Sequence, residues 1–126
     1  MRTHVCSGSP YEPTIGLSRA VRVGPWIAVA GTAPLVDGVT AHRGDVYRQT
    51  QRCLEIALAA IAEAGGRAEH VVRTRVLLVE ISRWPEAARA HGEIFGAIRP
   101  ACTFMQVSGF IDPEWLVEIE ADCVVE

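Results

Sequence analysis

The segment LVEIEADCV, residues 116–124, most constrains what this chain can fold into, because polar and apolar side chains alternate along it. A period of two is typical of a β-strand with one apolar and one polar face. The alternation puts Glu118, Glu120 and Asp122 on one face, with neighbouring carboxylates about 6.5–7 Å apart. Burying such a row without cations is very costly. We therefore expect this face to be solvated or matched by arginines.

Two other segments predict helices. In residues 45–64 the apolar side chains recur at three- and four-residue steps. Asp45 can cap the start of this helix, and Gly65-Gly66 can end it, because glycine readily adopts the left-handed conformation beyond a last turn. A shorter helix is predicted over residues 85–95, with Pro85 in its first turn.

The remaining apolar segments predict strands, since they are rich in β-branched residues or bounded by turn residues. These segments are residues 20–23 and 26–30, joined at Gly24-Pro25, then 70–81, 102–107 and 116–125. Asp37-Gly38 suits positive φ and predicts a loop or tight turn within residues 34–44. The order of elements predicts an α+β fold, in which two helices cover one face of a mixed sheet of about five to six strands.

At 126 residues the chain is expected to form a single domain, with residues 1–15 as an N-terminal extension or edge segment. Two helices can cover only one face of such a sheet. The other face must be polar or be covered by another part of the assembly. We therefore expect a small oligomer in which a neighbouring subunit covers this face.

Composition excludes several classes of protein. The formal net charge is −3, the chain has no lysine, and its arginines are scattered, so no phosphate-binding face for nucleic acid is expected. The cysteines form no Cys-x-x-Cys pair and the histidines no close cluster, so we predict reduced thiols and no metal site. The amino terminus has no apolar run of signal-peptide length, and no segment is long and apolar enough for a membrane span. A cytoplasmic protein is expected.

The acidic row has two interpretations. In the first, the acids form a salt-bridge ladder at a subunit contact, and the candidate cations on other predicted strands are Arg19, Arg22, Arg73 and Arg75. In the second, one acid stands apart in a cleft and serves as a general acid/base. The spacing alone does not choose between them.

Two other positions, Cys102 and Gly31-Thr32, are candidates for a role in a site. A nucleophilic Cys102 would need an adjacent base and a lowered pKa, and no histidine in the sequence forms a known pair with it; a free cysteine is commonly just a small hydrophobe. Gly31-Thr32 follows a predicted strand, so its backbone could approach a ligand, although a plain turn explains it equally well.

Five segments, in order along the chain, resemble the Rid family, also called YjgF, the reactive-intermediate deaminases. They are GLSRAVRVGPWIAVAGTAP, QTQRCLEIALAAIAEAGG, EHVVRTRVLLVEI, RPACT and LVEIEA, and they lie between Gly16 and Ala121. The resemblance implies a chorismate-mutase-like fold, a homotrimer and three small-metabolite clefts between subunits. It also implies hydrolysis, without a cofactor, of imines derived from enamines such as 2-aminoacrylate, to a 2-keto acid and ammonia.

The resemblance also assigns individual positions. Cys102 stands where deaminating members have an arginine that clamps the substrate carboxylate, and Phe104 stands where they often have cysteine. Glu118 matches the acid of the final strand that is thought to activate water. In the second helix, Ala88 and His91 correspond to the family's frequent asparagine and tyrosine.

From these matches we expect a divergent deaminase-like hydrolase in which Glu118 is the general acid/base. Backbone groups near Gly31, Thr32 and Thr103 would hold the substrate, and Arg19 or Arg99 could substitute for the missing arginine. Loss of a charge-assisted contact to a desolvated carboxylate weakens binding or rate by about 2–5 kcal/mol. The alternative is a trimeric metabolite-binding protein without turnover. A ribonuclease activity, sometimes ascribed to the family, gains nothing from this acidic, lysine-free composition.

Overall fold

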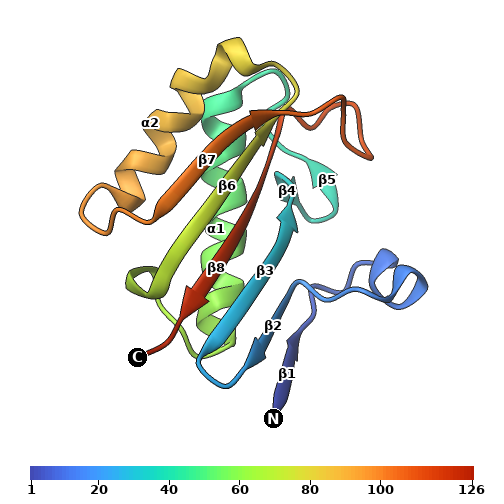
Figure 1. Ribbon diagram of the computed structural model, residues 1–126. Helices are drawn as coiled ribbons and strands as arrows, with labels where there is room; N and C mark the ends of the chain where they lie inside the picture. Colours follow the sequence, from blue (N-terminus) through green and yellow to red (C-terminus); the bar gives the residue numbers. More distant parts are fainter.

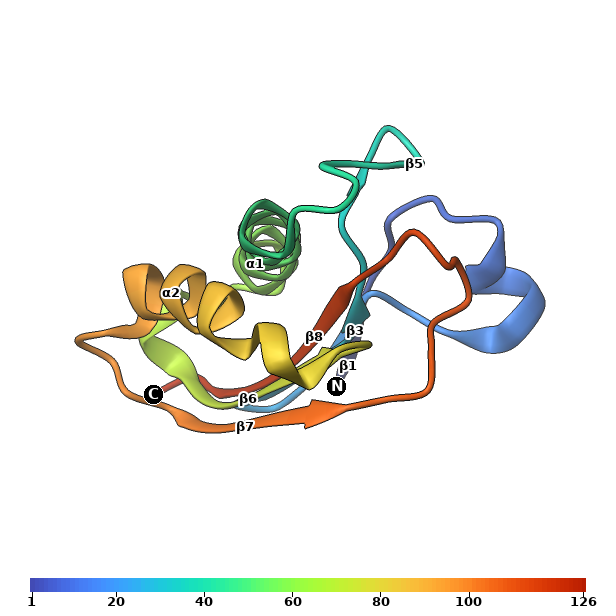
Figure 2. The same ribbon diagram turned by 90° about the horizontal axis from the view of Figure 1, so that it is seen from above.

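A computed structural model describes residues 1–126 and contains a six-stranded mixed sheet (Figure 1). Its strands are β1 (Arg2–Val5), β2 (Ala20–Val23), β3 (Trp26–Thr32), β6 (Val71–Leu78), β7 (Ala101–Gln106) and β8 (Val117–Val124). They lie in the order β1-β2-β3-β8-β6-β7, and only the β6–β7 pair is parallel. The two main helices, α1 (Val46–Glu63) and α2 (Trp84–Phe95), both lie on the same side of this sheet (Figure 2). The predicted α+β architecture is confirmed.

The start of the chain and the segment after β3 hold elements that the pattern did not predict. Residues 1–16, whose first fifteen were expected only as an N-terminal extension or edge segment, supply the edge strand β1 and a short helical turn, Glu12–Gly16. The predicted loop contains a hairpin of β4 (Leu35–Val36) and β5 (Val39–Thr40). Asp37 and Gly38 both have positive φ, 51° and 78°, as the tightest hairpin turns require.

Local signals explain where α1 begins and ends. The Asp45 side chain accepts a hydrogen bond from the Arg48 backbone N–H at 2.9 Å, which is the predicted cap. Beyond the helix, Gly65 takes the left-handed conformation with φ 89°. The predicted strand over residues 70–81 is shorter than expected, because Ile81–Arg83 form a 3₁₀ turn that leads into α2.

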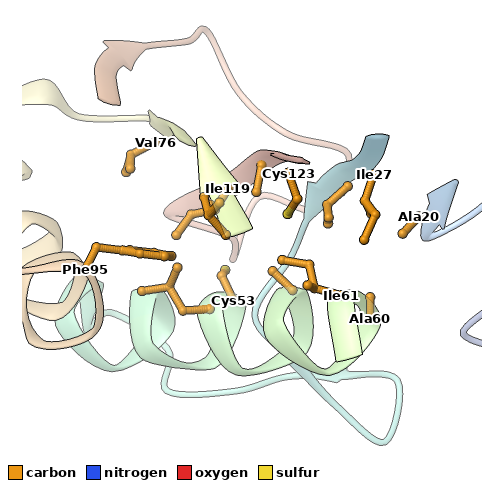
Figure 3. Packing of buried hydrophobic residues seen from close by; sticks show 14 of the residues in the cluster. Ala20, Ile27, Cys53, Ala60, Ile61, Val76, Phe95, Ile119 and Cys123 are labelled. Atoms are coloured by element: carbon orange, nitrogen blue, oxygen red, sulfur yellow. The ribbon is translucent and has the colours of Figure 1, made fainter. Parts of the chain in front are cut away.

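The core lies between the helices and one face of the sheet. In Figure 3, Ile27, Ile119 and Cys123 from the sheet face Cys53 and Ile61 from α1, and all five are 1% exposed or less. Each large apolar side chain that is buried in this way stabilises the fold by about 1.5–3 kcal/mol. None of the helices is both long and apolar enough to cross a membrane.

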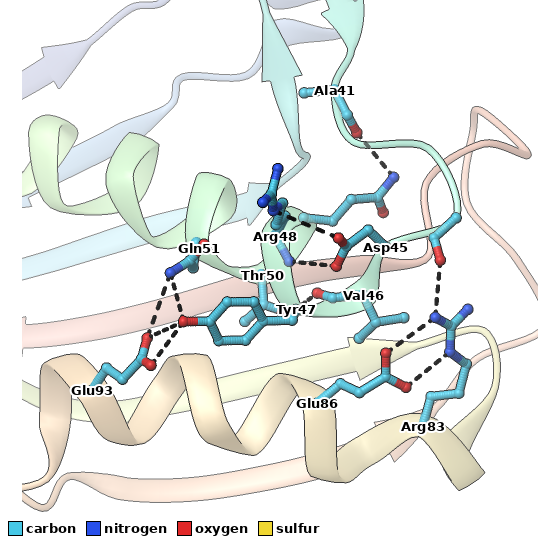
Figure 4. Close-up of polar contacts among 12 residues, drawn as sticks. Ala41, Asp45, Val46, Tyr47, Arg48, Thr50, Gln51, Arg83, Glu86 and Glu93 are labelled. Atoms are coloured by element: carbon cyan, nitrogen blue, oxygen red, sulfur yellow. Dashed lines mark hydrogen bonds and ion pairs between the residues drawn. The ribbon is translucent and has the colours of Figure 1, made fainter.

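Polar contacts lock α2 against α1 (Figure 4). The Tyr47 hydroxyl donates to the Glu93 carboxylate at 2.7–2.8 Å, and the Arg89 guanidinium lies 3.8 Å above the Tyr47 ring. Arg83 donates to the Gly44 carbonyl at 2.9 Å. These contacts join the solvent-exposed side of α2 to α1 and to the loop before it.

Candidate active site

Two of the three carboxylates on β8 are paired with arginines on β6. Arg73 Nε lies 3.8 Å from Asp122 Oδ2, and Arg75 Nη1 lies 3.5 Å from both Glu120 Oε1 and Asp122 Oδ2. The antiparallel register aligns Arg73 with Asp122 and Arg75 with Glu120. The salt-bridge ladder that the sequence allowed is therefore present at this end of the row.

Arg22, another cation considered for the ladder, does not join it. Its register partner on β3 is the buried Ile27, so Arg22 points to the helix side of the sheet. There it donates to the backbone carbonyls of Gly24 and Ala64, both at 2.8 Å. Its role in this structure is to tie β2 to the end of α1.

Glu118 stands apart from the other two acids. Its partner across the strand pair is Leu77, an apolar side chain, and Glu118 makes no ion pair. Burial raises the pKa of this half-buried carboxyl, Arg19 opposes that shift, and the neighbouring Glu120 adds to it. A carboxyl with a raised pKa and no fixed ionic partner is suited to proton transfer near neutral pH.

A β-bulge brings Gly31 beneath Glu118. Between the pairs Val29–Ala121 and Thr32–Ile119, β3 carries one more residue than β8. Glu118 Oε1 lies only 2.8 Å from where a Cβ on residue 31 would be. The carboxylate can occupy this place only because residue 31 is glycine. Gly31 and Thr32 thus lie within β3 rather than in a turn after it.

Arg19 and Thr32 complete this first group of residues. Arg19 Nη2 donates to the Gly31 carbonyl at 2.6 Å, and Arg19 Nε is buried without an acceptor. Thr32 is fully buried, and its hydroxyl donates to the Ala30 carbonyl at 2.8 Å. In the single chain, therefore, neither the hydroxyl nor the backbone of Thr32 is open to a ligand. We call Arg19, Gly31, Thr32 and Glu118 the acid group.

The other predicted residues gather around the edge strand β7 and α2. Cys102 and Thr103 are exposed, and Phe104 is half-buried against Trp84, with ring centroids 6.1 Å apart. His91 is buried on α2, 6.2 Å from the Phe104 ring. We call His91, Cys102, Thr103 and Phe104 the edge group.

Polar contacts of the edge group are few. The His91 ring Nε2 and the Thr74 hydroxyl are 2.8 Å apart, and burial lowers the pKa of His91. Ala88 is half-buried on the same helix. Arg99, one of the two arginines considered as a substitute cation, is exposed in the turn before β7 with φ 57°.

A single chain does not bring the two groups together. Cys102 aligns with the buried Thr74, which aligns with Ala121, so Cys102 is on the helix side of the sheet. Glu118 is on the opposite face, two strands away. Two surface cavities, of about 480 and 260 Å³, contain neither residue.

The chemistry of the remaining side chains adds no further centre. No group of three or more His, Cys, Asp or Glu is arranged to hold a metal ion. All four cysteines are free, with Cys53 and Cys123 buried and Cys6 and Cys102 exposed. The contact between Glu118 and Gly31 was not predicted. The available signal was a glycine inside a strand, which often marks a bulge or a close approach.

Comparison with known proteins identifies the family of the chain. The profile of the family described as endoribonuclease L-PSP matches residues 8–125. The chain belongs to this family. Its relatives include the uncharacterized protein SCO2049 of Streptomyces coelicolor, 42% identical over 118 residues, which span 94% of this chain and 88% of that protein. The RutC family protein PYRAB12510 of Pyrococcus abyssi is 34% identical over 112 residues, 87% of each chain.

The fold of the L-PSP family is seen in the crystal structure of Rv2704 from Mycobacterium tuberculosis, described as a member of the YjgF/YER057c/UK114 family. It superposes with a TM-score of 0.90 at 43% identity and covers 99% of this chain and 100% of that one. The resemblance to the YjgF family and the fold that it implied are thereby confirmed.

Proposed function

We propose that this L-PSP-family chain is a deaminase-like hydrolase of small reactive imines, working in clefts between the subunits of a homotrimer. The observation that carries the proposal is the isolation of Glu118, the one carboxylate of its row without an arginine partner. Arginines hold Glu120 and Asp122 in ion pairs, which leaves Glu118 free to exchange a proton.

The proposed reaction needs only water and this carboxylate. Glu118 takes a proton from water as the water oxygen bonds to the C=N carbon, and the imine nitrogen receives that proton. In the second step Glu118 accepts the proton of the new hydroxyl, the C–N bond breaks, and the proton passes to the departing nitrogen. The products are a 2-keto acid and ammonia. Raised by burial, the pKa of Glu118 suits both directions of transfer.

The uncovered sheet face supports the oligomer. Trp26 is 46% exposed and Val23 44% exposed. They are register partners on β3 and β2 and align with Val124 on β8. Two exposed apolar side chains beside the half-buried Val124 favour cover by another subunit. A second subunit would also let the acid group of one chain face the edge group of its neighbour.

Mixed trimers test the shared cleft. Glu118→Ala removes the acid, and the bulky Cys102→Trp fills the edge group. If each cleft uses both chains, co-assembly of these two inactive variants regenerates some clefts with both native groups, and activity returns. If each site lies within one chain, every site in the mixed trimer keeps a defect and no activity returns.

The proposal includes weak turnover of imines that carry a carboxylate, because Cys102 stands at the position of the family's arginine. The test is the rate of keto-acid release from the imine of 2-aminoacrylate, generated by a pyridoxal-phosphate lyase, with Glu118→Ala as control. Cys102→Arg should raise this rate, and the exposed position on an edge strand accommodates the longer side chain. A wild-type rate equal to that of an arginine-bearing relative would refute this account of the cleft.

The second candidate is a trimeric protein that binds a small uncharged or aromatic metabolite without consuming it. It is favoured by the aromatic surroundings of Phe104, which packs near Trp84 and His91. A thermal-shift screen of metabolites separates the candidates, because a ligand that is not consumed raises the melting temperature by mass action.

A further inference from the structure

We propose that Arg19 is a positioning residue that counters the partly buried charge of Glu118 from beside Gly31, rather than a clamp for the substrate. This inference rests on the proposed role of Glu118 as a proton carrier. It assigns the one arginine beside that acid to the protein's own carboxylate.

The first support is the geometry around Gly31. Its carbonyl accepts the 2.6 Å hydrogen bond from Arg19 Nη2, while Glu118 Oε1 lies 2.8 Å from the place of its missing Cβ. Gly31 therefore lies next to both the cation and the anion. The bulge in β3 creates this arrangement, since the added residue falls between Val29 and Thr32.

The second support is that the charge of Arg19 is not neutralised by an ion pair. Glu12, the other acid near Arg19, is occupied by the backbone N–H and the hydroxyl of Ser7. Arg19 Nε is buried without an acceptor, so that nitrogen cannot reach a ligand from solvent, although the half-buried side chain also lines the 260 Å³ surface cavity. Burial lowers the pKa of Arg19, and Glu118 is the main group opposing that shift.

The other groups around Glu118 do not favour its charged form. Glu120, next on the same face of β8, repels the charge. Leu77, aligned with it on β6, is apolar. From α1 comes the buried Cys53, whose pKa is raised, so it stays a neutral thiol that donates weakly to the Val117 carbonyl at 3.7 Å. Arg19 is thus the cation that counters burial at this site.

The test measures the protonation of Glu118 directly. Side-chain carboxyl carbons are labelled with ¹³C, the Glu118 signal is assigned by its loss in Glu118→Gln, and its midpoint is followed against pH. Arg19→Gln keeps an amide that can donate to the Gly31 carbonyl but removes the charge. It should raise the midpoint by about one pH unit or more, because an opposite charge at close range typically shifts a carboxyl by 1–3 units. Arg19→Lys, which keeps the charge, should stay closer to wild type.

Two outcomes decide the role. An unchanged midpoint in Arg19→Gln overturns the proposal, and if both variants also raise KM for a carboxylate-bearing imine, Arg19 is a substrate clamp instead. Arg19→Met, similar in length and uncharged, replaces Arg19→Gln if the latter does not fold. The titration needs no turnover. Absence of keto-acid release would therefore refute the proposed function, while the role of Arg19 would still be decided by the titration midpoint of Glu118.

Discussion

The two ends of the acidic row lie on the same face of β8 and carry the same kind of side chain, but their neighbouring side chains differ. At one end, Asp122 and Glu120 meet Arg73 and Arg75 across the strand pair. At the other end Glu118 meets an apolar leucine and rests on a glycine. The difference shows that the partners on β3 and β6, and not the carboxylates themselves, decide which acid is left without an ion pair.

The largest effect should come from removing the two kinds of acid in turn. Glu118→Gln should lower kcat for imine hydrolysis by about 10²–10⁴-fold, the usual contribution of a general acid/base. Glu120→Gln, the matched control one step along the same face, should leave kcat close to wild type. Keto-acid release measures both. Equal losses in the two variants would mean that the ends of the row do not differ in function.

The next effect concerns the glycine beneath the acid. A methyl group on residue 31 would meet Glu118 Oε1 at 2.8 Å and push the carboxylate aside. Gly31→Ala should lower kcat by about 10–100-fold, since small misplacements of a reacting group have effects of this size. The glycine has no positive φ, so its backbone tolerates alanine.

A second glycine provides the control for that experiment. Gly92 lies in α2 with no atom within 4 Å of its missing Cβ. Gly92→Ala should stabilise the fold by about 0.5–1 kcal/mol and leave kcat unchanged. A Gly31→Ala enzyme with wild-type kcat would show that the carboxylate can work from another position.

A smaller effect is expected from making the two ends alike. Leu77→Arg places a cation opposite Glu118, as Arg75 is placed opposite Glu120. The added charge should lower the pKa of Glu118, move the acid limb of the pH–rate profile to lower pH, and reduce the plateau rate by about tenfold, because a less basic carboxylate is a weaker proton acceptor. Leu77→Met is the control of similar size. If the acid limb shifts equally in Leu77→Met, packing rather than charge sets the ionisation of Glu118.

Local patterns predicted the parts of the fold that depend on near neighbours. The helix over residues 46–63 and its Asp45 cap followed from periodicity and a single side chain. The β4–β5 hairpin was missed, because strands of two residues are too short to show alternation. Strand β1 was not predicted as a strand, and residues 1–15 were expected only as an extension or edge segment, since only Val5 in β1 is buried.

The site depended on information that the sequence does not display. The alternation placed Glu118 on the polar face but could not distinguish it from Glu120, because the register with β6 decides which acid meets an arginine. Arg22 was considered for the acidic row, yet the turn at Gly24 pairs it with Ile27 and turns it to the helix side. The approach of Glu118 to Gly31 follows from a bulge that only the paired strands reveal.

The smallest effect should come from the paired end of the row. Arg75 is 37% exposed and its partners Glu120 and Asp122 are 39% and 19% exposed, so solvent screens much of their attraction. Arg75→Gln should therefore destabilise the fold by about 1 kcal/mol or less, seen as a drop of a few degrees in the melting temperature. kcat should not change, because these charges hold each other and not the substrate. Raising the salt concentration should reduce the difference in melting temperature between Arg75→Gln and wild type, because salt screens the ion pairs. A large loss of activity in this variant, with the melting temperature unchanged, would mean that the salt-bridge ladder takes part in the reaction. The two ends of the acidic row would then not differ in function.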